Sequence, residues 1–325
     1  PLLWRWKNRI DPGCLERFRR LPRMDAPAQP ASPTAPADDV GAGKPLCAGC
    51  GAKVGAARLA GALEALPTPG RDDVLSRPGD DAAVLDIGGG RRQVITTDHL
   101  RAFTEDPWLM ARIAAVHALG DIWAMGAAPQ AALASITLPR MSGPLQSRSM
   151  AEITRAAADI FAAEGAEVVG GHSTMGAEMV LGFTVTGICT DAPITLAGAR
   201  PGDALILTRP IGSGTLLAAD MAGDADGRHV AALLERMARP QGTAARLLKN
   251  AHAMTDVTGF GLAGHLWAMA RASGTGAEID VDAVPLYDGA LDMAEAGHRS
   301  TLYPDNAAAA PVDGADGPRA ALLHD

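Results

Sequence analysis

Aromatic residues are scarce in this chain of 325 residues, at 4% of the total, and there are only four cysteines. A core with so few rings must be built mainly from Ala, Leu, Val and Ile. The 47% share of hydrophobic residues supplies that material and excludes wholesale disorder. Four cysteines are too few for a disulfide framework, so a reducing cytosol fits the sequence better than secretion.

Excess positive charge and long apolar runs are also lacking. The net charge of −8 argues against a nucleic-acid partner held by phosphate contacts across the body of the chain. No window approaches the roughly 18 uninterrupted apolar residues of a transmembrane helix, so we expect no membrane span. The length itself predicts about two domains.

The first 45 residues differ from the rest. Residues 1–24 carry seven basic and two acidic residues, and residues 25–45 are rich in Ala and Pro without a periodic apolar pattern. Such a stretch is a semi-extended linker that buries too little surface to fold. The head, with Trp4 and Trp6, is interpreted as a short helix that packs on an absent domain or, alternatively, lies on a membrane surface. We expect both ends of the sequence to be cuts.

From residue 46 onward the pattern predicts an α/β (α+β) fold with two domains, residues 46–195 and 196–325. Asp106 can cap, and Pro107 can begin, a helix that runs to about residue 126. Other helices are expected at 146–164 and near 213–222, 228–238, 242–250 and 262–273. Strands are expected at 82–87 and 93–97, as a hairpin, and at 131–138, 167–169, 179–188, 204–208 and near 277–281.

Aspartates recur beside glycine or threonine in apolar surroundings, where an unpaired carboxylate is costly to desolvate. They are Asp80, Asp81, Asp98, Asp121 and Asp256. Any single one could be a cap or turn residue, but several that converge could hold Mg²⁺, which also accepts substrate phosphate oxygens. Asp121 lies in mid-helix, where capping cannot explain it, and His117 lies four residues earlier on the same face. This pair is either a structural hydrogen bond or part of an ion site.

A segment at the start of the first domain, Leu46-Cys47-Ala48-Gly49-Cys50-Gly51-Ala52-Lys53, combines two thiols with an ammonium group. Cys-x-x-Cys is half of a zinc site, but the other half is missing because Cys14 and Cys189 are isolated. Lys53 would favour the thiolate of Cys50, which is the nucleophilic form. The loop is therefore either reactive or a mobile leader with two inert thiols.

Gly170, Gly171 and His172 come directly after a predicted strand, where glycine N–H groups can cradle an anion. Gly-Gly after a strand is also often just a turn. Neither a P-loop nor a G-x-G-x-x-G following a strand occurs in the sequence. If the protein uses ATP, it does so without the common nucleotide-binding folds.

Six motifs, taken together and in order, resemble those of the selenide, water dikinase family, within the aminoimidazole-ribonucleotide-synthetase-like ATP-binding superfamily. They are Cys50-Gly51-Ala52-Lys53, Gly-Asp-Asp-Ala-Ala-Val from Gly79, Thr96-Thr97-Asp98, Asp-Ile-x-Ala-Met-Gly from Asp121, Gly-Gly-His-Ser from Gly170, and Met-Thr-Asp-Val-Thr-Gly-Phe-Gly-Leu from Met254. The resemblance covers about residues 46–325. It implies a two-domain ATP-binding fold, with the second domain truncated, and a homodimer. It also implies conversion of ATP, selenide and water to selenophosphate, AMP and phosphate with Mg²⁺.

The resemblance further implies roles for individual residues. Cys50 matches the reactive cysteine-or-selenocysteine position, and Lys53 matches the catalytic lysine of a lid loop. The magnesium ligands are matched by Asp81, Asp121 and Asp256. The positions that contact ATP are matched by Lys53, Gly79, Asp80, Asp98, Asp121, Gly170, Gly171 and His172.

Two departures from the family's pattern concern this site. Ala52 stands where a second cysteine is common, so a Cys50–Ala52 redox pair is impossible and Cys47 could substitute only from further upstream. His117 stands where asparagine is usual, at the contact of its helix with the metal and phosphates. Residues 4–11 resemble the C-terminal tail of a flavin-dependent pyridine-nucleotide oxidoreductase, a domain fused upstream in some members. Residues 1–24 are therefore interpreted as a remnant of that domain.

Two other functions stay open on the sequence. Another ATP-dependent synthetase or small-molecule kinase of the superfamily would share the aspartates but would not need the thiol and lysine. A non-catalytic thiol or zinc-binding module would instead hold zinc at Cys47 and Cys50. If the leading interpretation holds, the aspartates should converge, the first domain's sheet should pair with its twin, and residues 42–53 should close over bound ATP.

Overall fold

The structure is a computed structural model that describes residues 52–67, 70–76 and 78–325. By internal contacts the chain divides into two units, Pro1–Pro45 and Leu46–Asp325, and the description below concerns the second unit. The predicted head and linker, and the thiols Cys47 and Cys50, lie outside the described residues. Among the described residues, no helix has the length and apolar character needed to cross a membrane.

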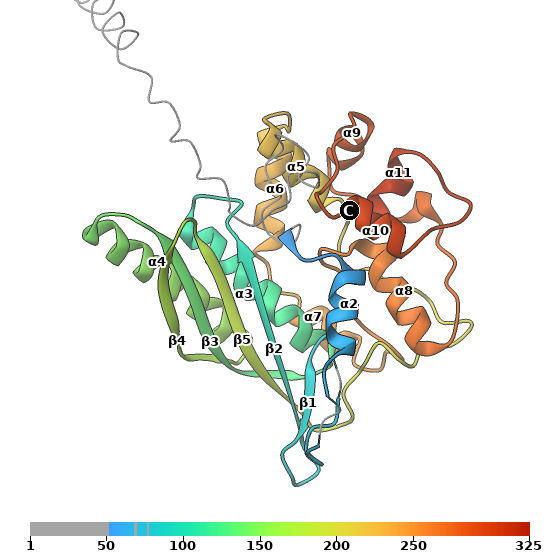
Figure 1. The fold of residues 1–325 in the computed structure, drawn as a ribbon, viewed down its shortest axis with the longest axis horizontal. Coiled ribbons are helices and arrows are strands. Elements are labelled where there is room, and N and C mark those ends of the chain that lie inside the picture. The colour runs from blue at the N-terminus through green and yellow to red at the C-terminus, as the bar shows by residue number, and fades with distance from the viewer. Residues whose placement is uncertain (1–51, 68–69, 77) are drawn as a thin grey trace, which may run out of the picture. The chain divides into compact units, whose positions relative to one another are not determined.

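A five-stranded mixed sheet forms the centre of the first half (Figure 1). Its strands are β1 (Ala83–Asp86), β2 (Arg92–Arg101), β3 (Ala128–Pro139), β4 (Glu167–Gly176) and β5 (Val180–Cys189). They lie in the order β1-β2-β5-β3-β4, and only β3 and β4 pair parallel. The predicted hairpin is confirmed as β1 and β2, although β2 continues to Arg101.

Two long helices, α3 (Pro107–Ala124) and α4 (Gly143–Ala163), cover one face of this sheet (Figure 1). The predicted start of α3 is confirmed: Asp106 Oδ1 accepts hydrogen bonds from the backbone N–H groups of Trp108 and Leu109, at 2.9 and 3.1 Å. Because α3 is apolar on nearly all sides, it lies buried between the sheet and the second half. Polar residues on α3 are consequently held close to the core.

The second half consists of helices around a separate apolar cluster that includes Leu216, Leu233 and Leu322. The helices are α5 (Ser213–Ala222), α6 (Gly227–Met237), α7 (Gly242–Leu247), α8 (Gly261–Ser273), α9 (Ala290–Glu295), α10 (Tyr303–Ala309) and α11 (Pro318–Ala321), with 3₁₀ turns Val281–Ala283 and Leu322–His324. The predicted helices correspond to α5 to α8. Helix α2 (Ala56–Glu64), near the start of the unit, contacts α10.

Two predicted strands of the second half are wrong. Residues 204–208 and 277–281 pair with no other segment as strands in the described chain, and Leu205 and Ile206 are 53% and 67% exposed. Both segments have strand-forming residues, but a strand also needs a neighbour for its N–H and C=O groups. The described part of this half offers a single bridge, between Ile211 and Leu286.

The glycine pair was also misplaced by the sequence pattern. Gly170, Gly171 and His172 do not follow a strand but lie inside β4, paired with β3. A Cβ on Gly171 would lie 2.1 Å from the carbonyl oxygen of Ala134, so glycine is needed for the two strands to approach. Glycine usually interrupts strands, and the pattern therefore ended this one too early.

Candidate active site

Three carboxylates that are far apart in sequence come together, as predicted. Asp81 precedes β1, Asp121 lies in the last turn of α3, and Asp256 lies in the segment between α7 and α8. One oxygen of each lies within 4.8 Å of the others. Two of the three are partly exposed and Asp121 is buried, at 8% exposed. The arrangement joins the two halves of the unit at one point.

Neighbouring residues of the first half fix Asp121. Thr96, on β2, donates a hydrogen bond from Oγ1 to Asp121 Oδ2 at 2.5 Å. Gly120 leaves room for the third carboxylate, since a Cβ there would lie 2.7 Å from Asp256 Oδ2. The helix ends one turn later, so the carboxylate also lies at the negative end of the α3 dipole, where a cation is favoured.

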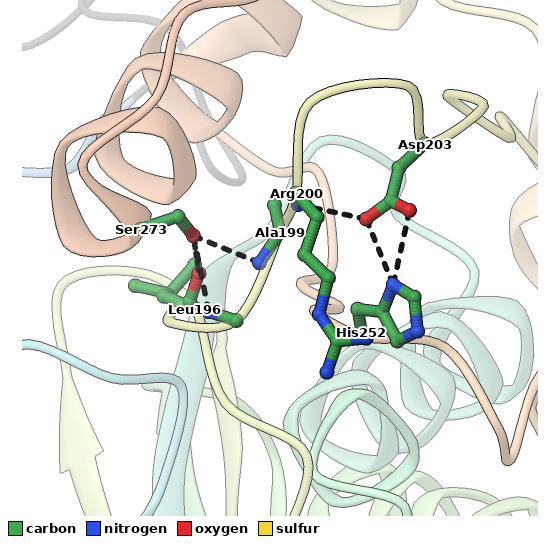
Figure 2. A network of polar contacts seen from close by, with 7 residues as sticks. Leu196, Ala199, Arg200, Asp203, His252 and Ser273 are labelled. Atoms are coloured by element: carbon green, nitrogen blue, oxygen red, sulfur yellow. Dashed lines mark hydrogen bonds and ion pairs between the residues drawn. The ribbon is translucent and has the colours of Figure 1, made fainter.

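Asp256 lies on a segment that is hydrogen-bonded to the connection between the two halves, residues 195–203. The backbone N–H of Met254 donates to the Thr195 carbonyl at 3.2 Å. Two residues earlier, His252 Nδ1 lies 2.9 Å from Asp203 Oδ2, and Asp203 also accepts the backbone N–H of Arg200 at 2.8 Å (Figure 2). The connection is therefore joined to the segment leading to Asp256 at Thr195 and at Asp203.

Ser273, the last residue of α8, holds the same connection from the other side (Figure 2). Its hydroxyl oxygen accepts the backbone N–H groups of Gly198 and Ala199 at 3.1 and 3.0 Å, and the hydroxyl donates to the Leu196 carbonyl at 3.1 Å. Asp80 accepts the Leu196 N–H at 3.3 Å from the first half. Residues 196–203 are thus anchored to both halves.

The carboxylates hold their protons strongly when no cation is present. Burial, followed by repulsion from Asp256 and Asp121, raises the pKa of Asp81 to about 9. Burial, followed by repulsion from Asp256 and Asp98, raises the pKa of Asp121 to about 8. Burial also raises the pKa of Asp256. Three mutually repelling carboxylates at this spacing need added positive charge to ionise at neutral pH.

The group suits a divalent cation with oxygen ligands. Asp81 Oδ2 is buried and has no hydrogen-bond partner, although its sister oxygen accepts the Thr255 hydroxyl at 2.9 Å. A buried carboxylate oxygen without a partner is costly, and a cation among the three carboxylates would satisfy it. Mg²⁺ requires oxygen ligands and tolerates remaining positions filled by water or phosphate, so the residues fit this ion.

Positive and aromatic groups border the cluster. The Lys53 ammonium lies 3.7 Å from Asp98 Oδ1 and 5.8 Å from the centre of the Phe260 ring. His117 Nε2 lies 3.2 Å from Asp98 Oδ2, and the charge of His117 also lowers the pKa of Asp121 against the effect of burial. His117 and Lys53 both lower the pKa of Asp256 against the effect of burial. Lys53 therefore lies close to Asp98 and adds positive charge beside the cluster.

Not every residue predicted for the site is brought there. Strands β5 and β3 separate Gly170, Gly171 and His172, on β4, from Asp98, on β2. Cys50 lies outside the described residues. Asp80 accepts two backbone N–H groups, of Asp81 and Leu196, as an ordinary turn residue does. Gly79 adopts φ of +136°, a conformation that favours glycine.

The contacts of two threonines and a histidine near the carboxylates were not predicted from the sequence. Thr96 and Thr255 each bond a cluster aspartate, and each comes one or two residues before another aspartate of the set. That adjacency was the available signal. His265, on α8, contacts Thr255, and burial lowers its pKa to about 4, so the ring is neutral at physiological pH. Its place in the middle of an apolar helix gave no hint of this contact.

A cavity of about 1120 Å³ reaches the carboxylate cluster at Asp256 and is lined by residues of both halves. Its wall includes His117 and Gly120 of α3, Asp256, and apolar side chains of the second half such as Leu207 and Leu262. The volume is sufficient for a drug-sized or nucleotide-sized ligand. The cavity thus offers space for an organic substrate next to Asp256, one of the three candidate metal ligands.

Comparison with known proteins identifies the fold. Family models match residues 79–189, as the N-terminal domain of AIR synthase related proteins, and residues 200–302, as their C-terminal domain. The crystal structure of thiamine monophosphate kinase from Aquifex aeolicus superimposes with a TM-score of 0.59 at 19% identity, covering 82% of each chain. At this identity the likeness establishes the fold alone. The fold is therefore that of an AIR synthase related protein.

Proteins of similar sequence show which family of AIR synthase related proteins this chain belongs to. A selenide, water dikinase of Nitratidesulfovibrio vulgaris is 39% identical over 259 residues, covering 77% of this chain and 73% of the relative. One from Geobacter metallireducens is 40% identical over 252 residues, covering 76% and 73%. The chain belongs to the selenide, water dikinase family.

Proposed function

We propose that this protein is a phosphotransferase that uses ATP to phosphorylate selenide, forming selenophosphate, AMP and phosphate. The observation that carries the proposal is the convergence of Asp81, Asp121 and Asp256, with Lys53 beside them, in a chain of this family. Phosphoryl transfer needs little covalent help from the protein, but it needs positioning and neutralisation of charge. The cluster and the lysine supply groups of both kinds.

Asp81, Asp121 and Asp256 would hold Mg²⁺. When bound, that ion would neutralise phosphate charge and polarise phosphoryl oxygens. Lys53 would stabilise the charge that develops on the transferred phosphoryl group. Gly79, Asp80 and Asp98 would contact ATP near the same edge of the sheet, with His117 oriented by its pairing to Asp98.

Cys50 would hold or deliver the reduced selenium as the soft nucleophile. Lys53 lies three residues downstream, so a loop that includes both would bring thiol and ammonium group to the triphosphate together and exclude water from the first transfer. The few cysteines and the need for reduced selenium both favour a cytoplasmic location.

We further propose a homodimer formed through the open face of the sheet, which α3 and α4 do not cover. This face carries hydroxyl pairs, such as Thr97 with Thr184 at 3.0 Å and Thr137 with Thr174 at 3.1 Å. It also carries Leu133, which is 48% exposed. A second copy would bring Gly170, Gly171 and His172 of its own β4 toward the ATP site. Sedimentation as a monomer at micromolar concentration, with turnover intact, would rule this dimer out.

The deciding assay is anaerobic incubation of the full chain with ATP, Mg²⁺ and selenide, with products separated by chromatography and ³¹P NMR. We expect AMP and selenophosphate in equal amounts, and no AMP when selenide is omitted. Cys50→Ser should reduce AMP release at limiting selenide and leave Mg²⁺-ATP binding intact. Release of ADP as the final product, or stoichiometric zinc bound at Cys47 and Cys50, would favour the alternative functions.

A further inference from the structure

A chain of hydrogen bonds leads from helix α8 to the carboxylate of Asp81. The backbone N–H of Thr258 donates to His265 Nε2 at 3.1 Å. The other ring nitrogen, Nδ1, lies 3.4 Å from the hydroxyl oxygen of Thr255. That hydroxyl in turn donates to Asp81 Oδ1 at 2.9 Å. The chain thus connects the second half of the unit to a carboxylate of the first half.

The direction of each bond follows from the first donor. A backbone N–H can only donate, so Nε2 must present its lone pair and the ring proton must reside on Nδ1. Nδ1–H then donates to the Thr255 oxygen, which leaves the threonine hydrogen for an acceptor. Of the two acceptors within reach, Asp81 Oδ1 at 2.9 Å is closer than the Asp256 carbonyl at 3.1 Å.

The hydrogen bond also orients the aspartate. Because Oδ1 is held by Thr255, Asp81 Oδ2 is the buried oxygen left without a hydrogen-bond partner, in a carboxylate that belongs to the cluster. Rotation of the carboxylate plane away from this orientation would break the bond to Thr255 and turn Oδ2 out of its buried position. The Phe260 ring lies 5.9 Å from the His265 ring, centre to centre, and limits the ring's movement.

We propose that His265 and Thr255 are positioning residues: through Nδ1–H and the Thr255 hydroxyl, His265 orients the Asp81 carboxylate to bind a divalent cation. The proposal rests on the proposed role of Asp81 as a magnesium ligand. Outer-shell partners of metal ligands commonly contribute about 10–100-fold in metal affinity.

The test is a titration of the full chain with Mn²⁺ in the absence of substrates, in which EPR measures the concentration of free Mn²⁺. Thr255→Val removes the hydroxyl at nearly constant volume and should weaken binding about 10–100-fold, and Thr255→Ser should restore it. Two His265 variants separate orientation from packing. His265→Asn places an amide N–H near the position of Nδ1 and should keep most of the affinity. His265→Gln places an acceptor near the position of Nε2, keeps the Thr258 bond, and should lose the affinity.

The outcomes distinguish this proposal from the function it rests on. If the wild-type protein binds no Mn²⁺, the proposed metal site fails. If the wild type binds and Thr255→Val binds equally well, or if Gln preserves affinity at position 265 better than Asn, the positioning role is overturned. Should the variants fail to fold, ¹⁵N NMR of the wild-type ring decides: a proton on Nδ1 supports the proposal, and a proton on Nε2 overturns it.

Discussion

The two halves contribute to the carboxylate cluster in different ways. Asp121 lies on a buried helix packed against a five-stranded sheet, and Thr96 of β2 fixes its side chain. Asp256 lies outside regular secondary structure, on a segment tied by a few polar contacts to the connection between the halves. The first half therefore holds its carboxylate on a packed helix, and the second half provides a carboxylate whose position depends on hydrogen bonds. A bound cation would be coordinated by carboxylates of both halves.

The largest effect is expected from removal of the carboxylate that the second half contributes. Asp256→Asn should lower selenide-dependent AMP release by about 10³-fold or more, because charge neutralisation dominates phosphoryl transfer. The same change removes like-charge repulsion, so the metal-free protein at pH 8 should be no less stable than wild type while Mg²⁺ ceases to raise its Tm. Asp159→Asn, on an exposed face of α4, is the matched control. Equal loss of activity in the control would point to a non-specific effect.

Lys53→Ala tests the positive side of the site. We expect kcat to fall about 10²–10³-fold, as on loss of one group that stabilises transition-state charge, with little change in the Kd for ATP. Lys249→Ala, an exposed lysine of the second half, should leave both values unchanged. Unchanged turnover in Lys53→Ala would favour the alternative interpretation, in which the segment before α2 is an inert leader.

The pH dependence of stability should reveal the crowding of carboxylates. Asp81 and Asp121 have pKa values raised to about 9 and about 8 in the folded state, against an ordinary value of 3.8. The folded protein therefore retains protons that the unfolded chain releases, and stability is lost as pH rises from about 4 to about 9. Without metal, Tm should fall by about 4 °C or more between pH 6 and pH 9. Mg²⁺ should raise Tm more at pH 9 than at pH 6; a Tm that rises with pH in metal-free protein would contradict this account.

The smallest effect is expected at the connection between the halves. Ser273→Ala removes the acceptor of two backbone N–H groups and should cost about 1–3 kcal/mol of unfolding free energy. Because Asp256 depends on this connection, Mn²⁺ affinity should fall a few-fold as well. The N-cap variant Asp226→Ala, which loses the bond to the Arg228 N–H at 2.9 Å, should cost about 1 kcal/mol and leave Mn²⁺ affinity unchanged. Equal loss of Mn²⁺ affinity in both variants would contradict the claim that the position of Asp256 depends on the connection held by Ser273.

Much of the first half could be predicted from the sequence because local signals and tertiary structure agree there. Asp106 and Pro107 mark the start of α3. Asp121 stood out because the sequence placed it inside a helix, away from any cap, although the structure shows that it lies in the last turn of α3. In the second half, the motif around Asp256 likewise gave the third carboxylate of the cluster. These predictions depended on residue type and neighbours along the chain, which the sequence displays directly.

The second half was harder to predict because its structure depends on partners that the sequence does not display. Leu205 and Ile206 favour a strand, but no described segment pairs with them as a strand. The contact of His265 with Thr255 depends on how the segment before α8 folds back onto that helix. Spacing along the chain does not reveal this fold-back, so the positioning chain became visible only in three dimensions.

The central claim is that both halves bind one cation, and anomalous diffraction from crystals of the full chain grown with Mn²⁺ tests it most directly. The account predicts a peak bound by one oxygen of each of Asp81, Asp121 and Asp256, at about 2.0–2.6 Å. A peak bound only by residues of the first half, or no peak within the cluster at saturating Mn²⁺, would contradict it.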